Sequence, residues 1–191
     1  MIYLVDENLT EHSHANLSLS ILSHHTLEDV ELVGLNLVDL SIGDLLSKIK
    51  RLYFRVTPKD IVLCPWAVPG SPSLDKAFDY LTDLCWVVCA AGNDSGDIAF
   101  WTPARCQNVI TGGALNKNGK PAGLSNVSRT ETKKLKWVTG TNYVSGSGST
   151  SGTSVSACLY AAFLAEALRL KDGSLLQTLI DERKQTALAE L

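Results

Sequence analysis

A serine in the C-terminal third of the chain carries the strongest chemical signal. Ser154 follows a Gly/Ser-rich run, residues 146–149, and precedes an apolar pattern typical of a helix, so it falls at or near a helix N-terminus. Unpaired N–H groups and the positive end of the helix dipole favour developing negative charge there. Such a serine is a nucleophile if a base and an oxyanion donor reach it. The same segment also fits an ordinary serine cap.

Three other polar residues have the types that nucleophilic catalysis requires. Asp6 ends the first apolar run, His14 begins the next helical pattern, and Asn93 follows a buried apolar run. An asparagine amide at that point either points into a cleft as an oxyanion donor or forms a plain turn. A carboxylate, an imidazole and a hydroxyl together suit acyl transfer, in which the imidazole takes the proton of the hydroxyl.

Apolar runs and helical patterns alternate along the chain and predict the elements that position these residues. We expect strands over 2–5, 30–38, 60–64, 86–91 and 108–115, helices over 14–22, 41–56, 73–84, 154–170 and 174–188, and loops and hairpins over 116–149. This alternation predicts one α/β domain over residues 1–191, with a mostly parallel sheet and helices on both faces. Catalytic groups should gather where the strands end.

The chain resembles the subtilase family of serine peptidases, whose triad runs Asp, His, Ser on an α/β fold. Ser151-Gly152-Thr153-Ser154 matches the nucleophile motif of the family, and Ala90-Ala91-Gly92-Asn93 is similar to its oxyanion-asparagine motif. Residues 2–6, 14–22, 109–114 and 124–126 resemble further family segments. The resemblance implies a subtilisin-like fold in which Ser154 attacks a peptide carbonyl, His14 is the base, Asp6 holds its tautomer and Asn93 stabilises the oxyanion.

The sequence departs from the family pattern around the histidine and the serine. Ala15 stands where the family has glycine, Cys158 stands where it commonly has proline, and the segment between Asp6 and His14 is short. His12 is a rival base, and His14 is preferred because the helical run starts there. The residue types of the triad remain intact.

The resemblance also implies a peptide substrate that is added as a strand between two edges of the protein. One edge includes Pro65-Trp66-Ala67, and this edge and Ala90-Ala91-Gly92 form the walls of the S1 pocket. Trp101 falls at the floor of the S1 pocket, beside Pro103, where the family has a cis-proline. A tryptophan at that floor predicts a shallow S1 pocket and a preference for a small P1 residue, although Trp66 and Trp101 equally fit a packing role.

Composition excludes several other classes. The chain has 191 residues, 45% hydrophobic and 19% charged, as in globular proteins, and its net charge of -3 argues against a nucleic-acid partner. The short basic run 133–136 is expected in a solvated loop or strand edge. The apolar stretch 155–170 is interrupted by Glu166 and is short for a membrane span. Five cysteines in mostly apolar surroundings, and no signal sequence, predict buried reduced thiols in a cytoplasmic protein.

Other chemistries have weaker support. His12 and His14, with Asp6, His24 or His25, offer metal ligands, but no cysteine pair or His-Glu-x-x-His helix accompanies them, so no metal or cofactor is expected. The Gly-rich run lacks the lysine of a phosphate-binding loop. We therefore expect a serine endopeptidase with a restricted peptide or protein substrate, under the control of a partner protein as a further hypothesis. The alternative is an inactive subtilase-fold binding module.

Overall fold

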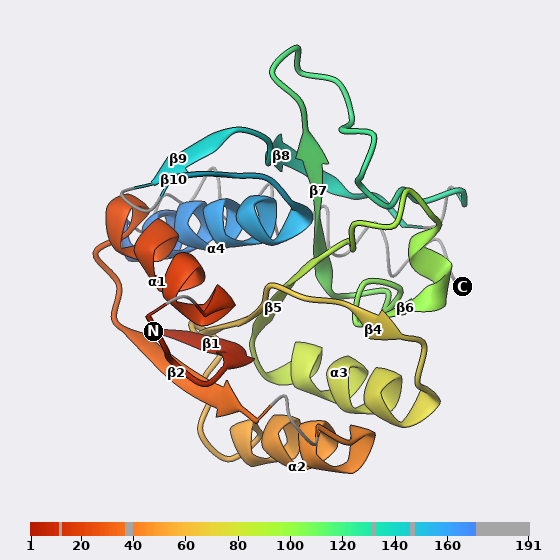
Figure 1. Cartoon of the computed structure of the whole chain (residues 1–191). Coiled ribbons are helices and arrows are strands. Elements are labelled where there is room, and N and C mark those ends of the chain that lie inside the picture. Colours follow the sequence, from red (N-terminus) through yellow and green to blue (C-terminus); the bar gives the residue numbers. More distant parts are fainter. Residues whose placement is uncertain (12, 37–39, 131–132, 146–147, 171–191) are drawn as a thin grey trace.

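The computed structural model describes all residues except 12, 37–39, 131–132, 146–147 and 171–191 (Figure 1). The rival base His12 and the helix expected over 174–188 therefore lie outside the described residues.

A six-stranded sheet forms the centre of the protein, in the order β2-β1-β3-β5-β7-β8. Its strands are β1 (Ile2–Glu7), β2 (Val30–Leu35), β3 (Ile61–Cys64), β5 (Trp86–Ala90), β7 (Ile110–Leu115) and β8 (Lys136–Thr139). Every neighbouring pair is parallel. The predicted α/β fold with a parallel sheet is confirmed.

Helices cover both faces of this sheet (Figure 1). Helices α1 (His14–His25) and α4 (Thr153–Leu170) lie on one face, and α2 (Ile42–Leu52) and α3 (Pro72–Leu84) lie on the other. Side chains alternate along a strand, so Ile2 and Leu4 of β1 pack with α1 and α4, whereas Tyr3 and Val5 pack with α2 and α3. Burial on both faces explains why β1, β3 and β5 are continuous apolar runs.

Several short strands and turns lie at the edge of the sheet where its strands end. β4 (Val68–Pro69) pairs antiparallel with β6 (Trp101–Thr102), which follows the 3-10 turn η1 (Ile98–Phe100). The hairpin of β9 (Tyr143–Ser145) and β10 (Gly148–Thr150) leads into α4. Within the described part of the chain, α4 is the one helix long and apolar enough to cross a membrane, and 61% of it is buried inside the protein.

The structure corrects the expectation for residues 116–149. This segment contains a hairpin, as expected, but it also contributes β8, a sixth parallel strand that pairs with β7 from Gly112 to Leu115. β8 is short and half-exposed, with Trp137 and Thr139 on its outer side. A short edge strand of this kind has no continuous apolar run, which is the signal that identified the central strands. Boundaries also move: α2 ends at Leu52 rather than at Val56.

Candidate active site

Asp6 and His14 meet where β1 ends and α1 begins. The Ser13 side chain caps α1 by accepting a hydrogen bond from the Asn16 N–H, and this cap makes His14 the first residue of the helix. His14 Nδ1 lies 2.8 Å from Asp6 Oδ2 and 3.1 Å from Oδ1. An ionised carboxylate only accepts hydrogen bonds, so Nδ1 carries the proton and Nε2 is left as the basic nitrogen.

The surroundings of His14 favour its charged form. Burial lowers the pKa of the imidazole, but the hydrogen bond that it donates to Asp6 and the negative charges of Asp6 and Glu7 outweigh this effect, so the pKa lies above its usual 6.5. Glu7 Oε1 also accepts a hydrogen bond from the backbone N–H of His14. The His14 side chain remains 36% exposed, which leaves its outer edge open to a ligand.

Ser154 and Asn93 lie side by side at the start of α4. A Cβ atom placed on Gly152 would lie 3.3 Å from Ser154 Oγ and 3.4 Å from Asn93 Nδ2, so these two polar atoms flank one point. Asn93 Oδ1 accepts hydrogen bonds from Thr153 N (2.9 Å) and Thr153 Oγ1 (3.0 Å). These bonds fix the amide and leave its N–H₂ group, beside the first turn of α4, to donate to a ligand.

The loop that carries Asn93 is held by a buried asparagine. Asn126, fully buried, accepts hydrogen bonds from the N–H groups of Asp94 and Gly96 and donates one to Ala91 O. Gly92 has a φ of +96°, and a Cβ there would lie 2.3 Å from Asn126 Nδ2. Only glycine fits this position without a shift, because both the backbone and the contact exclude a side chain.

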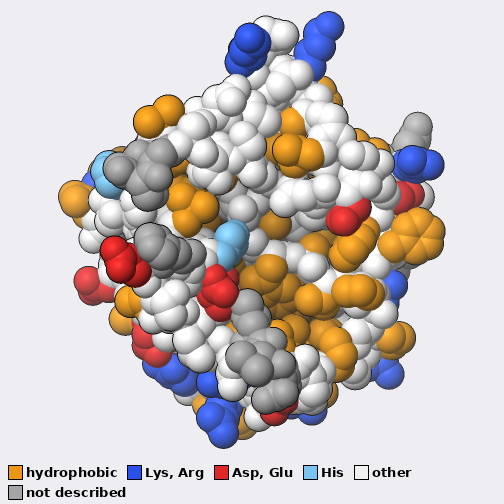
Figure 2. Space-filling model, viewed as in Figure 1, with side chains coloured by type: hydrophobic (Ala, Val, Ile, Leu, Met, Phe, Trp, Pro, Cys, Tyr) orange, Lys and Arg blue, Asp and Glu red, His pale blue; other side chains and the backbone are white. Residues whose placement is uncertain are grey.

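A cleft of about 440 Å³ joins these groups. Asp6, Glu7, His14, Asn93 and Ser154 line it, together with an apolar set that comprises Leu35, Leu40, Leu45, Trp66, Val68, Ala90 and Trp101. Figure 2 shows the same combination on the surface, with a histidine beside an acidic side chain at the edge of an apolar area. The structure therefore brings the four proposed catalytic residues to one cleft.

The proposed substrate-binding residues lie in the same cleft with one exception. Its lining includes Pro65, Trp66, Ala67, Ala90, Gly92 and Trp101. Ala91 does not line it: its side chain is fully buried. Ala91 follows the last residue of β5 and packs in the core on the opposite face of the sheet from Ala90, and its carbonyl accepts a hydrogen bond from Asn126.

The wall that carries Trp101 is anchored to α3. The Thr102–Pro103 peptide bond is cis, at the position that the resemblance implies. Thr102 Oγ1 donates to Asp75 Oδ1 at 2.5 Å, and Arg105 Nε donates to Asp75 Oδ2 at 3.0 Å. Trp66 Nε1 on the facing edge donates to Val5 O at 2.7 Å. Both edges of the cleft are thus tied to the central sheet or to the helices that pack on it.

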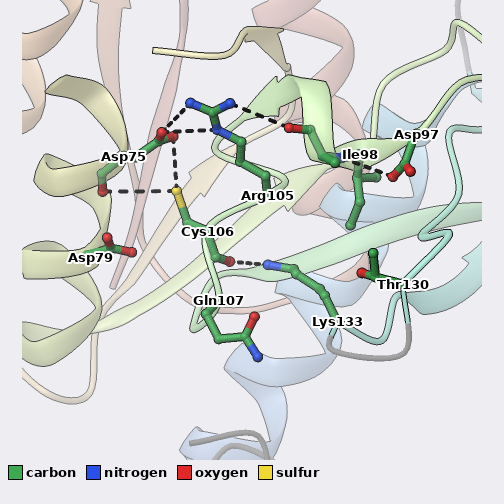
Figure 3. Close-up of a pocket in the computed structure, with 10 residues that line it drawn as sticks. Asp75, Asp79, Asp97, Ile98, Arg105, Cys106, Gln107, Thr130 and Lys133 are labelled. Carbon is green, nitrogen blue, oxygen red and sulfur yellow. Dashed lines mark hydrogen bonds and ion pairs between the residues drawn. The ribbon is translucent and has the colours of Figure 1, made fainter. Parts of the chain in front are cut away.

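A second cavity of about 460 Å³ lies behind this wall and contains Asp75, Arg105 and Lys133 (Figure 3). Lys134 is exposed and Lys136 lies on the edge strand β8, as expected for the basic run 133–136. Lys133 corrects that expectation, because it is only 6% exposed and its ammonium donates to Cys106 O and to Val109 O, the latter at 2.7 Å. Burial lowers its pKa to about 8. Its long apolar stem suits such a site, since only the charged end needs partners. Lys133 holds the loop before β7.

The described parts of the chain contain neither a cluster of metal ligands nor a disulfide bond. No three His, Cys, Asp or Glu side chains gather there in a way that could hold a metal ion. All five cysteines are free and buried, as predicted.

A parallel α/β sheet with an aspartate, a histidine and a helix-terminal serine around one cleft is an arrangement that recurs among serine hydrolases. The model of the subtilase family, Peptidase_S8, matches residues 12–186, and the chain belongs to this family of serine peptidases.

Solved structures agree with this assignment at the level of the fold. The chain is similar to a cold-adapted subtilisin-like serine proteinase (TM-score 0.69, 15% identity, 90% of this chain and 76% of that one). It is also similar to the prenylagaramide maturation protease PagA, with a TM-score of 0.69 and 17% identity over 90% of this chain and 76% of that one. A third similar structure is the self-cleaved protease domain of PatA, with a TM-score of 0.67 and 16% identity over 89% of this chain and 81% of that one. No curated protein sequence matches the chain.

Sequence reasoning did not assign roles to several residues that position the site. These are Glu7 beside His14, Ser18 beside Asp6, Thr153 beside Asn93, and Asn126 beneath the oxyanion loop. One signal was available: Ser18 follows His14 by one helical turn, so the two side chains share a face of α1.

Proposed function

We propose that this protein is a serine endopeptidase that hydrolyses peptide bonds through Asp6, His14 and Ser154, with Asn93 as oxyanion donor. Ser154 Oγ attacks the carbonyl carbon while His14 Nε2 takes its proton; the imidazolium then returns a proton to the leaving amine. Water repeats the sequence on the acyl-enzyme. The 2.8 Å contact between His14 and Asp6, in a cleft shared with Ser154, is the observation that most supports this mechanism.

Two donors form the proposed oxyanion site. Asn93 Nδ2 and the backbone N–H of Ser154 donate to the oxygen on which negative charge develops, and the Thr153 contacts keep the amide in place before the substrate arrives. Asp6 stabilises the imidazolium that forms and remains ionised throughout.

A fluorophosphonate probe tests the assignment, because it reacts with activated serines. The folded wild-type protein should be labelled, and Ser154→Ala and His14→Ala should not be. A folded wild-type chain that takes up no label at neutral pH would instead support the alternative of a binding module with a subtilase fold.

The acidic limb of the pH–rate profile should lie above pH 6.5. His14 must be neutral to act as base, and its pKa is raised by Asp6 and Glu7 against the effect of burial. kcat/KM is therefore expected to rise with pH through that raised pKa, measured with a peptide substrate whose own charge is constant. Glu7→Gln removes one of the two charges and should move the limb to lower pH, whereas a limb below pH 6 in the wild type contradicts this account.

The substrate is proposed to be a peptide or protein with a small residue at P1. Trp101 lines the cleft with Ala90 and Gly92, and its strand pairs with Val68 and Pro69 opposite. A P1-variable peptide library should therefore be cleaved after Ala, Gly or Ser, and Trp101→Ala should extend cleavage to larger apolar P1 residues. Strong wild-type preference for aromatic or basic P1 residues would refute this proposal.

A further inference from the structure

We propose that Ser18 is a positioning residue of the active site, whose hydroxyl fixes the Asp6 carboxylate in the orientation that His14 requires. This inference rests on the proposed peptidase function, since it concerns the same His14–Asp6 pair.

The Asp6 carboxylate is a buried charge with few donors. Asp6 is 4% exposed, and in the described part of the chain no lysine or arginine pairs with it. Its Oδ1 accepts a hydrogen bond from the Glu7 N–H at 2.9 Å, and its Oδ2 accepts from Ser18 Oγ at 3.0 Å and from His14 Nδ1 at 2.8 Å. Without Ser18, Oδ2 would keep His14 as its single close donor, and the carboxylate could turn about its Cβ–Cγ bond.

The Ser18 side chain has no role in the hydrogen bonding of its own helix. Serine inside a helix commonly bonds a carbonyl in the preceding turn or points to solvent. Ser18 does neither: it is 1% exposed, and its hydroxyl crosses from α1 to β1 to reach Asp6. Ala15, Ile21 and Leu22 on the buried side of α1 are apolar, so Ser18 is the polar exception on that face.

The other groups around Asp6 cannot replace this donor. The Cys158 thiol of α4 forms a hydrogen bond with the Ser18 hydroxyl, and both Cys158 and Cys64 of β3 interact with Asp6 through its charge alone. Burial raises the pKa of Cys158 to about 12 and that of Cys64 well above its usual range. Both thiols stay neutral at working pH, and a thiol is a weak donor. Glu7, the remaining charged neighbour, repels the carboxylate. The hydroxyl of Ser18 is therefore the strong side-chain donor that Asp6 has besides His14.

The test compares Ser18→Ala with Ser18→Thr, which keeps the hydroxyl. In Ser18→Ala, kcat should fall about tenfold, as expected for one lost hydrogen bond to a charged group, and KM should not change because Ser18 does not line the cleft. A carboxylate that has turned away stabilises the imidazolium less, so the pKa of His14 should fall. An NMR titration of the His14 ring measures this shift without any need for turnover. Ser18→Thr should restore both values.

Ser23→Ala is the matched control, because Ser23 lies on the same helix, is exposed, and bonds only Ser20 O. It should leave kcat and the His14 titration unchanged. If Ser18→Ala does not fold, as judged by thermal melting, Ser18→Cys takes its place: it is nearly isosteric and donates weakly, so it should show the same changes at a smaller size.

The outcomes separate this inference from the proposed function. Wild-type activity with unchanged kcat and His14 titration in Ser18→Ala would overturn the role of Ser18 and leave the peptidase intact. A shifted titration in a protein without peptidase activity would support the role of Ser18 and overturn the proposed function. A loss of kcat that Ser18→Thr does not restore would show that packing rather than the hydroxyl matters.

Discussion

Replacing Ser154 with alanine is expected to lower kcat about 10⁶-fold, the size of the loss known for subtilisin, another member of this family, when its catalytic serine is removed. The other hydroxyl beside Asn93, that of Thr153, is fully buried and donates to Asn93 Oδ1, so it does not take the place of Ser154. The measurement is single-turnover hydrolysis of a peptide p-nitroanilide by purified protein. Ser149→Ala, at an exposed position on β10, controls for the substitution itself and should keep full activity.

His14→Ala should cost about as much as Ser154→Ala, and the double variant should be no slower than either single one, since the two residues act as one unit. If the fold-loss of kcat in the double variant equals the product of the two single losses, the residues act independently. Such a result would contradict proton transfer from Ser154 to His14.

Replacing Asn93 with alanine has the second largest expected effect. Loss of the amide donor should lower kcat by about 10²–10³-fold, or about 2.7–4 kcal/mol, a range that comes from the equivalent substitution in subtilisin. KM should change little, because charge on the substrate oxygen develops only in the transition state. Steady-state kinetics on a short peptide separate the two constants, with the exposed Asn118→Ala as control.

A rise in KM with an unchanged kcat in Asn93→Ala would contradict the oxyanion role and assign Asn93 to ground-state binding. Thr153→Val refines the same point: it removes one of the two donors to Asn93 Oδ1 but leaves the Thr153 N–H in place, so a partial loss of kcat is expected.

The central fold could be predicted from the sequence because its strands are buried on both faces. β3 and β5 are unbroken apolar runs, and the helix α3, which has one apolar stripe, lies between them in the chain. β8 could not be recognised in this way, since half of its residues face solvent. Lys133 was misplaced for a related reason: a lysine is normally solvated, and the two carbonyls that bind its ammonium come from a distant loop.

The candidate site could likewise be predicted only in part. Asp6 and Asn93 could be placed at one edge of the sheet because Asp6 lies at the end of one parallel strand and Asn93 follows another. Ser154 could be placed because a helix begins beside it. The residues that position them depend on contacts between distant parts of the chain. Ser18 reaches Asp6 from another element, and Asn126 reaches the Gly92 loop from beyond β7. No local pattern encodes these contacts, so only three-dimensional packing reveals them.

The crystal structure of the protein after reaction with a fluorophosphonate tests the central claim most directly. We predict a phosphorus atom bonded to Ser154 Oγ, with one phosphonyl oxygen about 2.7–3.1 Å from both Asn93 Nδ2 and the Ser154 backbone nitrogen, as an oxyanion hole requires. His14 Nε2 should lie beside the phosphonate while Nδ1 keeps its contact with Asp6. An adduct on another residue, or a phosphonyl oxygen turned away from Asn93, would contradict the account.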